Sequence, residues 1–246
     1  MNPFLKNLIR KGIQALGYDI ISKQRLSDLT SFSMEAAIKR CKTRGIKIET
    51  VIDVGASNGS WSELCLKHYP NSFYFLVEAQ IIHEPQLMQF VKKHPKSAYL
   101  ISAAGNREGE IYFDAESPVG GLASEIPLDN YCIKTPVTTL DHIVSSNRLK
   151  PPYLIKLDTH GYEIPILEGA RNTLNHTHAV IMETYNFKVA HDSLRFFEMC
   201  DYMKKTGFLP IDIVDLLHRK FDQALWQMDL FFIPSTRHEF SYNSYE

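Results

Sequence analysis

The feature that most constrains the fold is segment 51–59, which reads Val-Ile-Asp-Val-Gly-Ala-Ser-Asn-Gly. Its apolar start predicts a β-strand, and helix-forming sequence follows directly from Ser60. Glycines at positions 55 and 59 let the backbone turn sharply and approach a ligand closely. Free N–H groups at the start of the next helix favour a polar or anionic group. The segment therefore predicts a strand–turn–helix cradle that suits a nucleotide with a carboxylate.

Two acidic residues end consecutive predicted strands. Asp53 precedes the first glycine of the cradle, which departs from the Gly-x-Gly-x-x-Gly spacing of dinucleotide-binding enzymes. A carboxylate there repels a pyrophosphate and attracts an ammonium group. Glu78 follows the apolar run 73–77, near the distance at which such folds place an acid on ribose hydroxyls. The two acids together favour a nucleoside site over the alternative that they only end strands.

From residue 50 onward, apolar strand-like runs alternate with helical patterns, which indicates a mostly parallel sheet with crossover helices. The last two strands have a short connection, so we expect them to be antiparallel at one edge. A further short strand is expected at 110–113. The main predicted strands are 51–54, 73–77, 99–103, 153–157, 179–183, 208–214 and 229–233, and the predicted helices between them are 60–68, 85–93, 140–146, 162–174 and 192–205.

Length and composition limit which domain organisation and which partners the chain can have. The chain has 246 residues, 44% of them hydrophobic, and no linker-like stretch divides it. We expect a helical extension at 1–48, one catalytic domain at 49–234 and a poorly ordered polar tail at 235–246. The formal net charge of -1 gives no general attraction to nucleic acid, which we exclude as a partner. Scattered cysteines without a signal peptide indicate a cytoplasmic protein.

Residues 3–16 predict a basic amphipathic helix, with Lys6, Arg10 and Lys11 opposite an apolar stripe. Such a stripe can dock on its own domain or on a second subunit, or it can lie on an anionic membrane. We favour docking, and leave a homo-oligomer and a peripheral membrane contact open. A second helix is expected at about 28–43.

A second motif spans residues 153–163, which run from a buried strand through a polar turn into a helix. Ligands of open sheets bind beyond the carboxyl ends of the strands, and buried carboxylates are costly without partners. Lys156 is expected to pair with Asp158 or Glu163, because an acid cluster needs a compensating cation. A site is indicated by the four acids that end four different predicted strands, Asp53, Glu78, Asp158 and Glu183.

Two runs within 155–170 resemble the hallmark of the FkbM family of S-adenosylmethionine-dependent methyltransferases. They are Ile-Lys-Leu-Asp-Thr-His-Gly-Tyr-Glu and the following Ile-Leu-Glu-Gly-Ala. The segments 102–109, 137–141 and 229–232 fall in the family's order, so the resemblance covers roughly residues 50–234. It implies a class I methyltransferase fold, an α/β Rossmann-like fold. Its sheet is seven-stranded and mostly parallel, with helices on both faces and an antiparallel last strand. It also implies methyl transfer from S-adenosyl-L-methionine, usually to a hydroxyl of a sugar, glycan, lipid or polyketide.

The resemblance further implies site residues. The cradle would hold the methionine end of the cofactor, Glu78 the ribose, and Ala104, with Asn106, would lie near the adenine. Asp158 would stand where donor and acceptor meet. The full cofactor-binding set expected is Asp53, Gly55, Ala56, Asn58, Gly59, Glu78, Ala104 and Asp158.

His160 departs from the family pattern, because many members have an acid at that position. A neutral imidazole can take a proton from a substrate hydroxyl, so His160 is either a base or a substituted polar rim residue. The expected catalytic residues are therefore Asp158 and His160. We assign no metal site, although Asp158, Glu183 and Asn186 offer the oxygen ligands that magnesium accepts.

The function expected is O-methylation of a sugar, glycan or related small molecule. One alternative is a donor-binding scaffold without catalysis, which His160 and the basic first helix motivate. The other is an NAD-dependent oxidoreductase, which the missing Gly-x-Gly-x-x-Gly weakens. The small-residue segment 117–124 is either a lid or a plain connector. Four aromatic rings could stack on a sugar face, those of Tyr185, Phe187, Phe196 and Phe197. We expect at least one of Phe196 and Phe197 to belong to the core.

Overall fold

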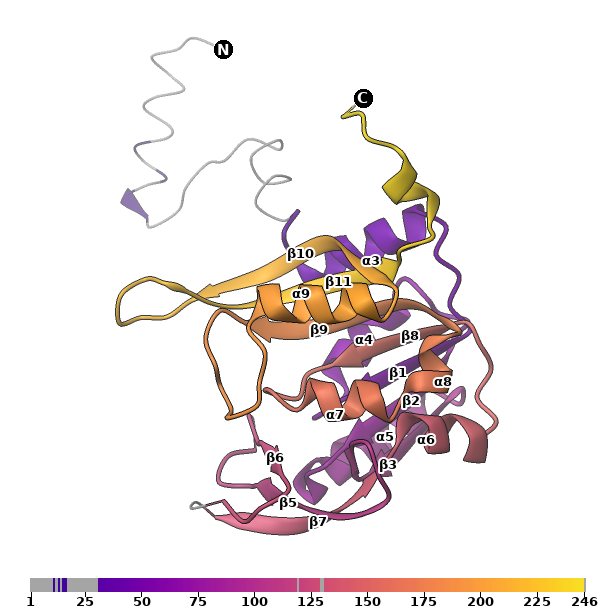
Figure 1. The fold of residues 1–246 in the computed structure, drawn as a ribbon, viewed down its shortest axis with the longest axis vertical. Helices are drawn as coiled ribbons and strands as arrows, with labels where there is room; N and C mark the ends of the chain where they lie inside the picture. Colours follow the sequence, from indigo (N-terminus) through magenta and orange to yellow (C-terminus); the bar gives the residue numbers. More distant parts are fainter. Residues whose placement is uncertain are drawn as a thin grey trace.

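The computed structural model describes residues 11, 13, 15, 16, 31–118, 120–128 and 131–245. Seven strands of this described part form one sheet in the order β10-β11-β9-β8-β1-β2-β3 (Figure 1). Five neighbouring strands run parallel, and β11 pairs antiparallel with both β9 and β10. The strands are β1 (Thr50–Val54), β2 (Phe73–Glu78), β3 (Ser97–Ile101), β8 (Tyr153–Leu157), β9 (Thr177–Tyr185), β10 (Phe208–His218) and β11 (Leu225–Pro234). The predicted mostly parallel sheet with an antiparallel last strand is confirmed.

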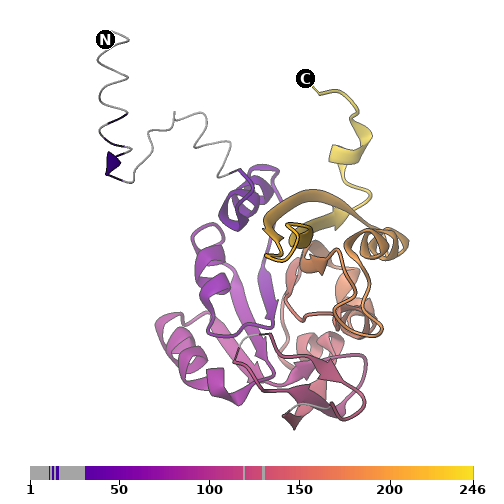
Figure 2. The same ribbon diagram turned by 90° about the vertical axis from the view of Figure 1, so that its left-hand side faces the viewer.

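Helices cover both faces of this sheet (Figure 2). One core packs beneath α3 (Met34–Thr43), α4 (Ser60–Leu66) and α5 (Glu84–Lys93). The other packs beneath α6 (Leu140–Ser146), α7 (Glu163–Glu168), α8 (Arg171–Leu174) and α9 (Phe196–Lys205). The short 3-10 helices are η1 (Ile81–His83) and η2 (His238–Ser241).

Two predicted helices differ from the structure. The helix predicted at 162–174 is divided into α7 and α8 near Gly169, where a Cβ would lie 2.0 Å from the main-chain oxygen of Gly105. The backbones at Gly169 and Gly105 contact each other directly there, and a side chain at position 169 would prevent this contact. The helix predicted from 192 begins only at Phe196, because Ser193 Oγ accepts hydrogen bonds from the backbone of Val189 and Ala190 in a tight turn.

A second, smaller sheet lies beside the main one, at the lower left of Figure 1. In the described chain its order is β4-β7-β5-β6, with β4 (Ala103–Ala104), β5 (Gly109–Asp114), β6 (Ala123–Ser124) and β7 (Cys132–Thr138). The sequence predicts β5 alone among these strands. Between β5 and β7, residues Pro118, Gly120, Gly121 and Ala123 line a cavity at the carboxyl ends of the main strands.

The chain ends are described in part. The helix predicted at 3–16 lies outside the described residues except at positions 11, 13, 15 and 16, of which the first three are helical. The helix predicted at 28–43 begins at Met34, since Ser33 caps it by accepting from the backbone of Ala36. In the tail predicted at 235–246, the described residues form η2, and Arg237 donates a 3.0 Å hydrogen bond to the carbonyl of Arg44. None of the described helices has the length and apolar character needed to cross a bilayer.

Candidate functional site

A cavity of about 320 Å³ opens at the carboxyl ends of β1, β2, β8 and β9. Its wall on the other side comes from the small sheet and from Pro118, Gly120 and Gly121. Five of the predicted site residues line it, namely Gly55, Glu78, Ala104, Asp158 and His160. The structure therefore brings together residues from four separate segments of the sequence at the edge where ligands of open α/β sheets bind.

Gly55 lies where the turn after β1 contacts the turn after β8. It has a left-handed backbone with φ +75°, and a Cβ at this position would lie 2.1 Å from the main-chain oxygen of Asp158. Residues other than glycine are strained at such φ values, and no side chain fits this contact. The turns after β1 and β8 can therefore touch only because residue 55 is glycine.

Glu78 is held between two turns. Its Oε2 accepts a 2.7 Å hydrogen bond from the backbone N–H of Ser57, and its Oε1 accepts a 2.8 Å bond from that of Gln80. The residue is 5% exposed and faces the cavity. Since each carboxylate oxygen keeps a further lone pair, Glu78 is fixed in place and can still accept from two ligand hydroxyls.

The other predicted cradle residues build the turn instead of lining the cavity. Asp53 is fully buried, and its Oδ2 accepts a 2.7 Å hydrogen bond from Ser62 Oγ. Asn58 Oδ1 accepts from the backbone of Ser60, and Gly59 is the N-cap residue of α4, with φ +80°. Ala56 is buried and outside the cavity wall. Asp53 thus lies outside the cavity wall, and its Oδ1 accepts no hydrogen bond from the described residues.

Lys156 is the buried cation of the site. Its Nζ lies 2.6 Å from Asp158 Oδ2 and 4.0 Å from Asp53 Oδ1. Burial works to lower the pKa of Lys156, but the charges of Asp158 and Asp53 outweigh it and raise that pKa. The predicted ion pair is confirmed with Asp158, while Glu163 instead accepts from the backbone of Gly161 at 2.9 Å.

His160 reaches the cavity from a left-handed backbone with φ +51°. Its Nδ1 lies 2.7 Å from the hydroxyl of Tyr185 and 3.0 Å from Glu183 Oε1, and its Nε2 lies 3.9 Å from Asp158 Oδ1. Burial lowers the pKa of the imidazole, but the hydrogen bond and charge of Glu183, with the charges of Asp158 and Glu163, raise it above the ordinary value.

Glu183 completes an acid-rich wall. Its Oε1 accepts from the Tyr185 hydroxyl, and its Oε2 accepts a 2.5 Å hydrogen bond from Gln227 Nε2. Asp229 stands opposite Glu183 in the β9–β11 register, and burial raises the pKa of Asp229 to about 7, although Lys156 opposes this. Carboxylates thus outnumber the cations Lys156 and His160 at this end of the sheet, which favours a cationic ligand.

One group of described residues has the geometry of a metal site. Ligand atoms of Asp158, His160 and Glu183 lie within 4.8 Å of one another. Lys156 already binds Asp158, however, and Glu183 accepts from Gln227 and Tyr185. The backbone of Asn186, the third ligand expected from the sequence, donates to the carbonyl of Trp226, and the residue is not part of the cavity wall. Donors of the protein therefore already contact both carboxylates of this cluster, and we assign it no metal.

Within the segment 117–124, Pro118, Gly120, Gly121 and Ala123 line the cavity, which is compatible with both the lid and the connector interpretation. Two residues that the sequence did not indicate contact the start of this segment. Gln80 Nε2 donates to the carbonyl of Ser117 at 3.1 Å, and His83 Nε2 donates to that of Pro118 at 2.7 Å. Tyr162, another missed lining residue, donates to Glu125 at 2.9 Å. All three residues lie just after β2 or β8, but no local pattern marks Gln80 and His83 as contacts of a distant segment.

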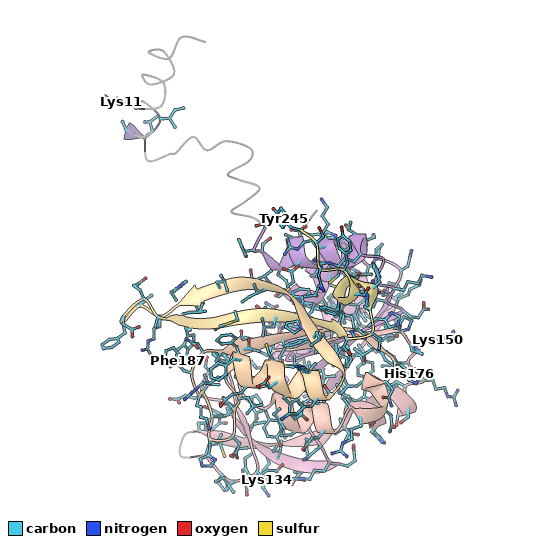
Figure 3. All side chains as sticks on the ribbon, turned by 45° about the horizontal axis from the view of Figure 1, so that its top comes forward. Lys11, Lys134, Lys150, His176, Phe187 and Tyr245 are labelled. Atoms are coloured by element: carbon cyan, nitrogen blue, oxygen red, sulfur yellow. The ribbon has the colours of Figure 1, made fainter. Side chains whose placement is uncertain are left out.

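The predicted sugar-stacking rings are mostly engaged elsewhere. Phe187 stacks on Trp226 with ring centroids 5.4 Å apart, and the Arg219 guanidinium lies 4.1 Å from its centroid, beside the β10–β11 hairpin (Figure 3). Tyr185 is 7% exposed. Phe196 packs on the core, as expected for at least one of the α9 pair, and Phe197 is exposed.

Comparisons with known proteins agree with this geometry. A model of the methyltransferase FkbM domain family matches residues 53–210. The solved structure of methyltransferase FkbM from Methylobacillus flagellatus KT has a TM-score of 0.51 at 18% identity, and the match covers 74% of this chain and 43% of that protein. The fibrillarin pre-rRNA processing protein of Methanococcus jannaschii has a TM-score of 0.50 at 11% identity, over 85% of this chain and 77% of that one. A search of curated proteins gives no match.

At these identities the two structures show the fold alone, which is the class I methyltransferase fold. This chain spans less than half the length of the Methylobacillus protein. The family model, in contrast, spans more than half of this chain, from Asp53 at the end of β1 to Pro210 in β10. The chain belongs to the FkbM family of methyltransferases.

Proposed function

We propose that the protein transfers a methyl group from S-adenosylmethionine to a hydroxyl of a sugar, glycan or related small molecule. The observation that carries the proposal is the cavity in which the Gly55 turn, the Glu78 carboxylate and the Asp158 turn meet. The substrate class follows the family resemblance, because acceptor contacts lie in variable loops.

The residues present suit this cofactor. Glu78, already fixed by two backbone N–H groups, would accept from the ribose hydroxyls. The turn from Gly55 to Ser57 would hold the methionine end, and Ala104 would lie beside the adenine. The excess of carboxylates around Asp158 suits a ligand that carries a positive charge. When bound, S-adenosylmethionine supplies an electrophilic methyl group on a sulfonium.

The protein's part in the reaction is alignment and proton removal. Holding the acceptor oxygen in line with the methyl carbon gives much of the acceleration in such displacements. An aliphatic hydroxyl is weakly acidic, so a base at the cavity must take its proton as the bond to oxygen forms. Asp158 and His160 are the candidates that reach the cavity from the turn after β8.

The test is a donor-binding and transfer assay on the purified full chain. Calorimetry with S-adenosylmethionine and with NAD identifies the cofactor, and isotopically labelled methyl donor is then incubated with a panel of sugars, glycans and small alcohols. The proposal predicts S-adenosylmethionine binding and a labelled methyl ether. Preference for NAD would overturn the proposal. Donor binding without a product across the panel would contradict catalysis and favour the scaffold alternative.

A further inference from the structure

His160 is the residue at which this chain departs from the acid common in its family, and the structure holds it in an unusual way. Its φ of +51° is uncommon for a residue with a side chain. The imidazole lines the cavity, and its two ring nitrogens face different surroundings. Nδ1 faces the buried pair Glu183 and Tyr185, whereas Nε2 faces the Asp158 side of the cavity.

The hydrogen bonds determine which nitrogen carries the proton. The Tyr185 hydroxyl donates to Glu183 Oε1, so its oxygen is left to accept. An ionised Glu183 also only accepts. Nδ1 contacts both groups and must therefore be the donor, which leaves the lone pair of a neutral imidazole on Nε2. Gln227 fixes the other oxygen of Glu183 at 2.5 Å, so the carboxylate cannot turn away.

Asp158 is less suited to take a proton. Its Oδ2 lies 2.6 Å from the buried ammonium of Lys156, and protonating this carboxylate would leave that cation with a weakened partner. Its function is then to hold Lys156 and to contribute negative charge to the cavity. Of the two candidate bases, His160 can take a proton without weakening the ion pair of Lys156.

We propose that His160 Nε2 is the general base for the acceptor hydroxyl and that Glu183 is the positioning residue that fixes its tautomer and stabilises the imidazolium formed. This assignment rests on the proposed function and names the base of that reaction. The acceptor oxygen forms its bond to the methyl carbon while the carbon–sulfur bond breaks, and that electron pair stays on sulfur. The hydroxyl proton moves to Nε2, which gives a methyl ether, a neutral thioether and an imidazolium.

The charges around the imidazole set its pH dependence. Strand β9 supplies Glu183 and Tyr185, and α7 supplies Glu163. Strand β8 and the turn after it supply Lys156 and Asp158. Strand β11 places Gln227 and Asp229 behind Glu183. Three of the carboxylates, those of Glu183, Asp158 and Glu163, raise the pKa of His160. Methyl transfer should then increase as the pH rises through this raised pKa, because only the neutral imidazole accepts a proton.

An NMR titration tests the positioning without any turnover. The ring nitrogens of His160 are assigned by their loss in His160→Asn and followed with pH in the full chain. The wild type should show a proton on Nδ1 and a pKa above that of free histidine. In Glu183→Gln this pKa should be lower by about 1 pH unit or more. In Asp229→Asn, which removes a carboxyl of the same wall without a bond to the imidazole, it should stay near the wild-type value. A wild-type proton on Nε2, or an unchanged pKa in Glu183→Gln, would overturn the proposal.

Kinetics with the labelled donor tests the base. Glu183→Gln should lose about 100-fold or more in kcat, and His160→Asn a similar factor, with donor Kd within about threefold of wild type. His160→Asn should also lose the acidic limb of the pH–rate profile. Full turnover in His160→Asn would overturn the assignment. If the titration behaves as expected while no acceptor is methylated, the proposed function fails and the positioning of His160 stands.

Discussion

The main-chain oxygen of Asp158 lies 2.1 Å from the point where a Cβ on Gly55 would stand. Strands β1 and β8 are neighbours in the sheet, and this contact continues their pairing into the turns that follow. The turn proposed to hold the donor is therefore fixed, backbone to backbone, to the turn that carries Asp158 and His160. In the proposed function, donor binding and proton transfer would both depend on this one contact, which only glycine permits.

Gly55→Ala should destabilise the protein more than a change of φ alone explains. Gly45→Ala is the matched control, because Gly45 has a similar φ of +72° and no described atom lies within 4 Å of the point where its Cβ would stand. The control should lose about 1–2 kcal/mol of unfolding free energy from backbone strain. Gly55→Ala should lose about 3 kcal/mol or more, since the backbone of Asp158 must also move. Equal losses in urea denaturation would contradict the contact.

Glu78→Gln should weaken donor binding while the fold is retained. The amide cannot accept from both backbone N–H groups and two ligand hydroxyls, and charge-assisted hydrogen bonds contribute about 1.5–3 kcal/mol. The dissociation constant for S-adenosylhomocysteine, measured by calorimetry, should rise about 10- to 100-fold. Glu84→Gln is the control, because Glu84 accepts from Tyr99 outside the cavity wall. A similar effect in both variants would show that Glu78 is not a direct ligand.

Asp229→Asn should change how stability depends on pH. Burial raises the pKa of Asp229 to about 7, above its value in the unfolded chain, so the folded state binds the proton more tightly. The stability contributed by this group is complete below the unfolded pKa and is lost as the pH rises toward 7. Relative to wild type, Asp229→Asn should therefore gain about 2–3 kcal/mol between pH 5 and pH 8 in urea denaturation. Parallel pH dependences of the two proteins would contradict this.

Chelation should leave the protein unaffected. The oxygens of Asp158 and Glu183 accept from Lys156, Gln227 and Tyr185, so a divalent ion would have to displace these donors. Treatment with EDTA should change neither the melting temperature nor the rate of methyl transfer. A loss of rate that magnesium restores would show that the ion displaces Lys156 and binds the cluster.

The sequence predicts the main sheet well because its central strands are buried apolar runs. In β1 and β8 every residue is buried, and an apolar run between turn residues is the expected pattern for such strands. The small sheet lacks this signal. β4 and β6 have two residues each, and β7 carries Lys134 and Pro136 at exposed positions. Their pairing comes from tertiary contacts that no local pattern records.

The site was predictable where acids end buried strands, as Glu78 and Asp158 do. The contacts of Asp53 depend on strand register, which local pattern does not give: β1 and β8 pair Asp53 with Lys156, whose Nζ lies 4.0 Å from Asp53 Oδ1. Gln80 and His83 could not be found from local pattern either, because their partners are distant in sequence. Gln80 contacts Ser117, 37 residues away, and His83 contacts Pro118, 35 residues away. Such contacts depend on how the loop folds back over the sheet.

A crystal structure of the full chain with S-adenosylhomocysteine would show whether this cavity holds the adenosyl cofactor. We expect density for the ligand between the Gly55 turn, the Glu78 carboxylate and the Asp158 turn, with the ribose hydroxyls on Glu78. Density for the ligand at another place, or a cavity that stays empty at saturating concentration, would contradict this expectation.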